Sequence, residues 1–494
     1  MNKEIEIIFP VQFNRRVYML LFILGILIII IGYVTYSKFV DKHFGIDVNK
    51  ETCAYTMEDG IDYIPMKPGR MFLIQLLNIA GLGPIFGAVQ GALFGPAAFI
   101  WIAFGTVFAG GVHDYFSGMM SLRHNGDSIP EITGNYLGNG ARQAMRVFSS
   151  ILLLLTGTVF MTGPANLLSS MKLFSIDNVN IWLAIIFVYY FLATILPVDK
   201  IIGKIYPLFG AALLIMAFGV GGSLLIGDYT LPEMTFKTMH PDGLPIWAIL
   251  FTTIACGAIS GFHSTQSPLM ARCLPNEKYG RPVFYGAMAA EGVIAMIWAA
   301  AAMSFFGTGQ AGINGLGEAL ANGGPGGVVN TIAFSTMGKI GGLLAMIGVV
   351  AAPITSGDTA FRSVRLTIAD AMRFDQKENK NRLIIAIPLF LVAFGLTRID
   401  FNIIWRYFAF TNQALATIVL WTASAYLASN KKSHLMTTIP ALFMNCVIFT
   451  YILQAPEGFK LATNIAYPLG LVLAAAFAFI MIKKLNSIKK EASK

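Results

Sequence analysis

Long apolar stretches alternate along this chain with short polar segments that often contain glycine or proline. An α-helix needs about 20 mostly apolar residues to cross the hydrocarbon core of a bilayer. Thirteen stretches are candidates, near residues 18–36, 71–92, 97–121, 146–166, 181–197, 204–226, 246–271, 282–306, 328–356, 383–396, 402–428, 435–453 and 463–482. The tenth is short and needs its flanking residues to cross. The pattern therefore predicts an all-α polytopic membrane protein with about thirteen transmembrane helices.

The composition indicates a lipid environment. Of the 494 residues, 56% are hydrophobic and 12% are charged, whereas a soluble domain has about 25% charged residues. So few charges exclude a soluble enzyme, a nucleic-acid-binding protein and a disordered chain. The four cysteines form no CxxC pair that would indicate zinc or a disulfide framework. We expect the first stretch to be retained as a span, because no small-residue cleavage signature follows it.

The distribution of Lys and Arg predicts an orientation, because cytoplasmic loops carry an excess of these residues. With the basic C-terminus inside, the inner segments hold 26 of the 35 Lys and Arg residues and the outer segments hold eight. Thirteen spans would place Lys3, Arg15 and Arg16 outside, so the orientation of the first helix stays open. We expect a multi-pass protein of the plasma (inner) membrane with a cytoplasmic C-terminus.

Two of the stretches, the second and the seventh, are interrupted. At mid-span the second contains Gly81, Gly83 and Pro84, and glycine weakens a helix while proline removes an amide donor. The seventh contains a polar, glycine-rich segment at 257–268. Unwound backbone at membrane depth is tolerated only where it is buried in protein or lines a wet cavity, and helix N-termini favour an anion. The alternative is that the small residues only let helices pack closely.

The places of the two interruptions suggest an inverted repeat. Each opens a run of five stretches, and the charge distribution gives the two interrupted stretches opposite directions. Such a pair points to the binding site of a secondary transporter. We therefore divide the chain into 1–70 (an extra helix and a cytoplasmic loop), 71–226 (the first five-helix repeat), 227–428 (the second) and 429–494 (two further helices and a basic tail).

Ionisable side chains within spans are unfavourable in lipid, so each is a candidate site residue. Asp114 follows a histidine in the third span, and this pair either holds a proton or is satisfied by a neighbouring helix. His263 follows the second interruption and is either a ligand contact or a structural histidine. Glu291 either couples to a proton or pairs with Arg272 or Arg281.

The ninth span ends in polar residues. Thr355, Ser356 and Asp358 offer hard oxygen ligands for Na⁺, or a carboxyl that can carry a proton. A helix end at which Asp358 pairs with Arg362, four residues on, is the alternative. This span is the eighth of the ten repeat helices. In that respect the chain resembles LeuT-type transporters, in which a Thr–Ser pair on the corresponding helix binds sodium.

Several short motifs stand out between residues 55 and 375. They are Asp59-Gly-Ile-Asp-Tyr-Ile-Pro65, Ile79-Ala-Gly-Leu-Gly-Pro84, Ala109-Gly-Gly-Val-His-Asp114, Arg123-His-Asn-Gly-Asp-Ser-Ile-Pro-Glu131, Cys256-Gly-Ala-Ile-Ser-Gly-Phe-His263 and Tyr285-Gly-Ala-Met288. Together they resemble the carbon starvation protein A (CstA) family. The resemblance implies a LeuT-like 5+5 inverted repeat with broken first and sixth core helices. It also implies gradient-driven uptake of peptides or pyruvate under carbon starvation. Long members of that family carry a His-His pair where this chain has Ile74-Gln75, so we do not transfer a proton-linked role to these positions. This chain is also shorter than the long members, so we do not transfer their substrate.

The motifs and the resemblance predict an ion-coupled symporter, not an enzyme, that imports a small carboxylate such as pyruvate, or short peptides. A passive channel or a membrane-embedded nutrient sensor is the alternative. The expected substrate-binding residues are Gln75, Gly81, Gly83, Pro84, Gly261, Phe262, His263 and Ser264. The expected ion-coupling residues are Thr355, Ser356, Asp358, Asp114 and Glu291, with H⁺ or Na⁺ as the ion and Na⁺ at Thr355 and Ser356. We expect no cofactor and no nucleic-acid partner, and the oligomeric state stays open.

Overall fold

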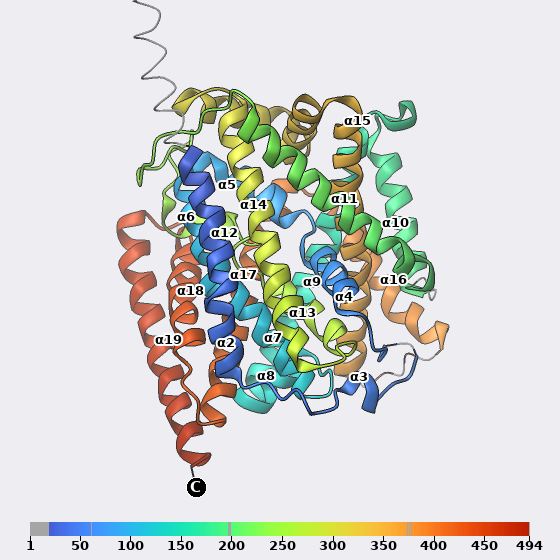
Figure 1. Ribbon diagram of the computed structural model, residues 1–494, viewed down its shortest axis with the longest axis vertical. Helices are drawn as coiled ribbons and strands as arrows, with labels where there is room; N and C mark the ends of the chain where they lie inside the picture. The colour runs from blue at the N-terminus through green and yellow to red at the C-terminus, as the bar shows by residue number, and fades with distance from the viewer. Residues whose placement is uncertain are drawn as a thin grey trace, which may run out of the picture.

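The protein is a bundle of long helices that stand side by side, with shorter helices across its two ends (Figure 1). The computed structural model describes residues 19–60, 62–195, 199–372, 374, 376 and 378–493. No β-strand occurs within these ranges, so the all-α expectation is confirmed for them. The expectation for Lys3, Arg15 and Arg16 concerns residues outside the described ranges.

Some helices are continuous and others are joined end to end from short segments. In chain order they are α2 (Tyr36–Phe44), α3 (Cys53–Thr56), α4 (Pro68–Ile79), η1 (Gly83–Gly87), α5 (Ala88–Gly91), η2 (Ala92–Phe94), α6 (Ala97–Phe104), η3 (Gly105–Gly110), α7 (Gly111–Arg123), α8 (Ile129–Leu137), α9 (Asn139–Ser170), η4 (Leu173–Ser175), α10 (Val179–Ile195), α11 (Asp199–Ile226), η5 (Ile246–Leu250), α12 (Phe251–Thr253), α13 (Gly261–Ala271), η6 (Glu277–Tyr279), η7 (Arg281–Tyr285), α14 (Gly286–Phe305), α15 (Gly309–Met372), α16 (Asn379–Leu396), α17 (Phe401–Ser429), α18 (Leu435–Gln454) and α19 (Thr463–Glu491).

Eight helices within the described ranges are long and apolar enough to cross a membrane, or up to nine if a bent pair is counted as one span. That pair is the first expected interruption: Pro68–Ile79 and Gly83–Phe94 meet at an angle of 55°. Helix α10 is apolar over Val179–Ala193, but this stretch is shorter than those eight spans. A polytopic membrane protein is therefore supported, while the number thirteen and the four-part division of the chain stay predictions.

Helix α15 differs from its expected span, 328–356. It runs as a 64-residue element that turns at Gly324 (φ 61°) and Gly338 (φ 67°), backbone conformations that glycine adopts without strain. The long final segment therefore begins after Gly338, and it continues to Met372. Thr355, Ser356 and Asp358 lie inside this helix and not at its end. The reason is that neither proline nor glycine follows Asp358 before Met372, so no helix breaker interrupts the segment.

Helix α9 supports both interrupted spans from within the bundle. It packs against α8, α10, α15 and α17. Its Phe160 ring lies 5.9 Å from the ring of Phe262 in α13 and 6.1 Å from that of Phe408 in α17. A Cβ added to Gly81 would lie 2.6 Å from the Phe160 ring. The same aromatic side chain therefore fixes how closely α4 and α13 approach α9.

Loops that the charge pattern places in the cytoplasm meet at one end of the bundle, the end at which the C-terminus lies (Figure 1). Arg123 at the end of α7 holds Glu277 by two bonds of 2.7 and 2.8 Å. The amide of Asp47 donates to the same carboxylate at 2.7 Å. Arg272 donates to the carbonyl of Gly126 at 3.0 Å. We call the Arg123–Glu277 pair and its partner Asp47 the end latch.

Candidate functional site

The two interrupted spans meet at their breaks. The first break, 80–82, separates α4 from η1, and the second, 254–260, separates α12 from α13. A Cβ added to Gly83 would lie 2.2 Å from the Cβ of Cys256. A Cβ added to Gly257, at φ 90°, would lie 2.5 Å from the Cβ of Ala295 in α14 and in ordinary contact, at 3.5 Å, with the Cα of Pro84. The glycines at the breaks therefore allow the two spans to pack closely, as the packing interpretation expected, and a binding role for the opened backbone stays a prediction.

Backbone groups freed by the second break find partners on the neighbouring span. Trp101 of α6 donates its indole N–H to the carbonyl of Ile254 at 2.9 Å. The hydroxyl of Thr106 in η3 donates to the carbonyl of Gly257, also at 2.9 Å. An unwound segment in a low-dielectric interior needs such partners, because an unsatisfied carbonyl is strongly destabilising there. The segment 97–110 therefore stabilises the break.

Asn412 of α17 caps the first turn of α13. Its Oδ1 accepts the amide of Phe262 at 2.7 Å and the hydroxyl of Ser260 at 3.1 Å. Its Nδ2 donates to the Sγ of Cys256 at 3.3 Å. The amide of Phe262, expected to receive a substrate carboxylate, is thus already paired in this conformation. Sequence reasoning missed Asn412, although the polar pair Asn412-Gln413 in the middle of an apolar stretch was a usable signal.

A chain of buried ionisable groups passes beside the second break. Asp114 of α7 lies between two imidazoles: Oδ1 is 2.7 Å from Nδ1 of His113, and Oδ2 is 2.8 Å from Nδ1 of His263. Nε2 of His263 lies 3.3 Å from Oε2 of Glu291 in α14. All four side chains are fully buried. Three spans therefore contribute to one polar cluster, which we call the Asp114 cluster.

The expectation that Glu291 pairs with Arg272 or Arg281 is wrong. Arg272 bonds to the carbonyl of Gly126, and Arg281 lies 3.3 Å from the hydroxyl of Ser37. Both arginines stay near the end of the bundle, because their spans leave the hydrophobic interior before these positions. Glu291 instead faces His263, a contact that no local spacing in the sequence reveals.

The other expected substrate residues are buried around the breaks. Gln75 of α4 is completely buried, and neither atom of its amide has a hydrogen-bond partner among the described residues. Ser264 donates its hydroxyl to the carbonyl of Gly261 at 2.6 Å, so that group serves its own helix. Pro84 belongs to η1, directly after the first break. Their role in substrate binding stays a prediction, with Gln75 the side chain best placed to accept a new partner.

The expected cation ligands join α15 to the first interrupted span. Ser356 donates to the carbonyl of Leu77 in α4 at 2.9 Å and lies 3.0 Å from the carbonyl of Ala352. Thr355 bonds to Ala352 at 2.8 Å. Asp358 lies 4.0 Å from Arg362, four residues on, as the alternative interpretation expected. Oxygen atoms from two spans thus converge just before the first break.

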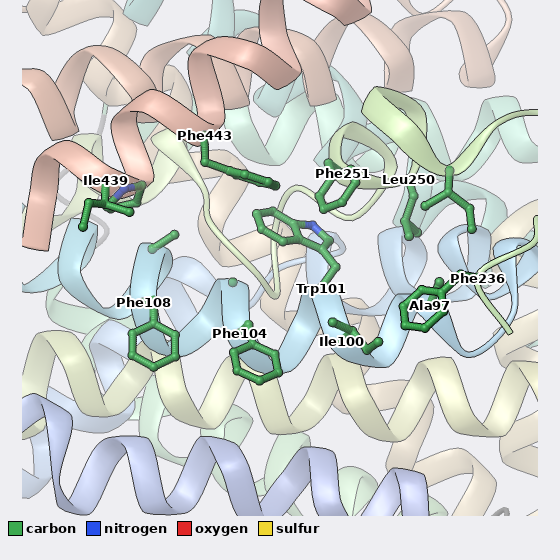
Figure 2. A pocket seen from close by; sticks show the side chains of 14 residues that line it. Ala97, Ile100, Trp101, Phe104, Phe108, Phe236, Leu250, Phe251, Ile439 and Phe443 are labelled. Carbon is green, nitrogen blue, oxygen red and sulfur yellow. The ribbon is translucent and has the colours of Figure 1, made fainter. Parts of the chain in front are cut away.

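A pocket lies beside the second break, where its lining residue Trp101 bonds to Ile254, and that lining is almost wholly apolar. It measures about 440 Å³ and lies between α6, η3, η5, α12 and α18. Figure 2 shows Trp101, Phe251 and Phe443 gathered on one side of it. Phe104 and Phe108 are 47% and 43% exposed, so this pocket opens toward the lipid-facing surface. It offers no polar group to a carboxylate.

Comparisons with known sequences identify relatives across much of the chain. The family model described as "Carbon starvation protein CstA" matches residues 17–173 and 166–321. An uncharacterized membrane protein of Haemophilus influenzae is 44% identical over 348 residues, which cover 60% of this chain and 94% of that protein.

Named relatives are more distant. The peptide transporter CstA of Campylobacter jejuni is 28% identical, covering 56% of this chain and 49% of its own. The pyruvate/proton symporter BtsT of Escherichia coli is 26% identical, covering 54% of this chain and 46% of its own. The chain thus spans about half the length of these relatives, both of which are transporters.

Solved structures share the fold. Mhp1, a nucleobase-cation-symport-1 family transporter, aligns with a TM-score of 0.51 over 86% of this chain and 95% of its own, at 14% identity. A manganese transporter of Eremococcus coleocola, solved as a point mutant, aligns at 0.50 over 86% and 95%, at 11% identity. At such identities the likeness concerns the arrangement of helices alone. It supports the LeuT-like expectation at the level of the fold.

Proposed function

Because this chain belongs to the carbon starvation protein CstA family, we propose that it imports a small carboxylate such as pyruvate, or a short peptide, by secondary active transport coupled to H⁺ or Na⁺. The observation that carries the proposal is the contact between the two breaks, at Gly83 and Cys256. Paired broken spans are where transporters of this architecture bind their substrate and ion.

The substrate would bind beside α4 and the first turn of α13. The unpaired amide of Gln75 can donate to a carboxylate or accept from a peptide N–H. The start of α13 carries the partial positive charge of a helix N-terminus, and its Phe262 amide is now held by Asn412. A charged carboxylate accepts more strongly than a neutral amide oxygen, so it is suited to replace Asn412 there.

The coupling ion would bind where Ser356 meets the carbonyl of Leu77. A Na⁺ there would be shared between α15 and the first interrupted span, with Thr355 as a further oxygen ligand. A proton would instead be carried by the carboxyl of Asp358. In either case the ion would favour the conformation that joins these two spans. Coupling requires this difference in ion affinity between conformations.

The deciding experiment is uptake into proteoliposomes that contain the purified full chain. Labelled pyruvate and a labelled dipeptide are offered separately, with an imposed proton gradient, a sodium gradient or neither. We expect accumulation of one substrate above its external concentration under one gradient. Uptake that only equilibrates would indicate the passive channel, and no uptake of either compound under any gradient would refute the proposed substrates.

Two variants test the residues. Gln75→Ala should raise the substrate concentration needed for half-maximal uptake. Ser356→Ala should weaken the dependence on the coupling ion. Thr367→Ala is the matched control on the same helix, because its hydroxyl bonds within its own helix, to the carbonyl of Ser363 one turn earlier at 2.9 Å. If Ser356→Ala and Thr367→Ala show the same ion dependence, Ser356 is not an ion ligand.

A further inference from the structure

We infer that Cys256, His263 and Glu291 form a binding site for one divalent transition-metal ion of the Zn²⁺ class. The Sγ, imidazole nitrogen and carboxylate oxygen that these residues offer all lie within 4.8 Å of one another, and all three residues are buried. This inference goes beyond transport and does not depend on it, because metal binding is measured directly.

The donor set suits such an ion. A thiolate, an imidazole and a carboxylate are ligands that zinc takes at about 2.0–2.3 Å, whereas Na⁺ and Mg²⁺ prefer oxygen alone. Tetrahedral ligand atoms at those bond lengths lie roughly 3.3–3.8 Å apart. Nε2 of His263 and Oε2 of Glu291 are already 3.3 Å apart. Cys256 then needs to approach by only a modest shift.

The hydrogen bonds around His263 leave Nε2 available to a cation. Asp114 offers only acceptor oxygens, and one of them lies 2.8 Å from Nδ1 of His263, so the N–H of that ring nitrogen donates to it. A neutral ring then directs the Nε2 lone pair toward Glu291, which is itself an acceptor. Nε2 and both oxygens of Glu291 have no hydrogen-bond partner among the described residues. Two buried acceptors that face one another are stabilised by a cation to which both can bind.

The surrounding groups match the usual support of a metal site. A carboxylate that holds the far nitrogen of a ligating histidine orients the ring and makes it more basic, and Asp114 is placed to do this for His263. Asn412 donates to the Sγ of Cys256 at 3.3 Å, which favours a thiolate. A thiolate and a carboxylate together balance the two positive charges of the ion, which lowers the cost of burying it in the low-dielectric interior. A fourth position would stay open.

The test is the metal content of the purified full chain after expression in medium supplemented with Zn²⁺ or with Co²⁺. We expect one bound ion per chain by mass spectrometry of the metal. The Co²⁺ form should show thiolate-to-cobalt charge-transfer absorption. Cys256→Ser and Glu291→Gln should lose the bound ion, and Asp114→Asn should weaken binding by about 10- to 100-fold.

Cys53→Ser is the matched control, since Cys53 is also buried but belongs to α3; it should bind as the wild type does. A chelator should lower the unfolding temperature of the wild type but not that of Cys256→Ser, and this readout also covers a variant that folds poorly. An empty wild-type chain, or Cys256→Ser with undiminished binding, would overturn the inference; His263 would then be an imidazolium between two carboxylates. Neither result bears on substrate uptake, so the two proposals can fail separately.

Discussion

At the scale of single residues, the sequence identified the members of the Asp114 cluster but not their contacts. Asp114, His263 and Glu291 each stood out because ionisable groups are rare within spans. Their contacts join residues that are 149 positions apart in the case of His263 and Asp114, and no local spacing encodes such a distance. Cys256 and Asn412 were missed for a related reason, since each gains importance only from its partners.

Asp114→Asn should lower the free energy of unfolding by about 1.5–3 kcal/mol, because it removes the charged acceptor of hydrogen bonds from two buried imidazoles. Thermal or denaturant unfolding of the purified protein measures this. Asp242→Asn is the control, since its side chain is 81% exposed, and it should change little. Equal stabilities of the two variants would show that the Asp114 cluster contributes no net stability.

Asn412→Ala should reduce stability by about 1–3 kcal/mol, the effect of leaving a buried donor without its acceptor. The amide of Phe262 and the hydroxyl of Ser260 would both lose Oδ1 as a partner. Asn430→Ala, at an exposed position directly after the end of the same helix, is the comparison. Hydrogen exchange should also show faster opening in the first turn of α13; unchanged exchange there would argue against the cap.

At the scale of elements, glycine and proline predicted the first interruption and glycine predicted the second, because these residue types act on the backbone itself. The second was expected over 257–268, but the break lies at 254–260, and Pro268 lies inside α13. The expected span 328–356 fared less well. Apolar composition marks where a helix is in lipid, but it does not mark where the helix ends, so α15 was placed too early. Two glycines with positive φ, at 324 and 338, determine where α15 turns. They could not be distinguished in the sequence from the many other glycines of the chain.

Gly83→Ala should abolish transport and reduce the yield of folded protein. The added Cβ would meet the Cβ of Cys256 at 2.2 Å, and neither atom lies on a flexible end that can move aside. In contrast, Gly222→Ala in α11 meets no atom within 4 Å, and it should be neutral or stabilise the helix by up to about 1 kcal/mol. Uptake assays and size-exclusion profiles compare the two. Normal uptake by Gly83→Ala would show that the breaks separate more easily than their contact indicates.

At the scale of the whole molecule, the excess of Lys and Arg predicted which loops share one end. The structure brings several of these loops together through the end latch and the contact of Arg272 with Gly126. The charge pattern contains this information because it is set by the membrane and not by any one contact. Which side of the membrane that end faces stays a prediction.

Arg123→Ala should loosen the end latch, because Glu277, with a side chain 3% exposed, would lose its charged partner and keep only the amide of Asp47. Cys273 reports on this: burial raises the pKa of its thiol to about 11, so little reactive thiolate is present at pH 8. Loosening should return the pKa toward its ordinary value and speed alkylation several-fold at that pH. Mass spectrometry of the Cys273 peptide measures the rate.

Arg142→Ala serves as the control for the end latch, since Arg142 lies 3.4 Å from the partly exposed Glu131. Its rate of Cys273 alkylation should match that of the wild type. Cys273 in Arg123→Ala could instead be alkylated at the same rate as in the wild type and in Arg142→Ala, with the rate rising only near pH 11. That result would show that this end of the bundle stays closed without Arg123.

The bond from Asn412 to Phe262 means that the proposed binding region already has a hydrogen-bond acceptor in place. Under the proposed function, an arriving anion would replace the Asn412 side chain at this amide, and the side chain would return when the anion leaves. The binding free energy of the anion would then be the difference between its bond to the amide and the bond of Asn412. Such a difference would disfavour uncharged compounds and would keep the bound state short-lived. A transporter that releases its substrate in every cycle would gain from this exchange, because the Phe262 amide would never be left without a hydrogen-bond acceptor in the low-dielectric interior.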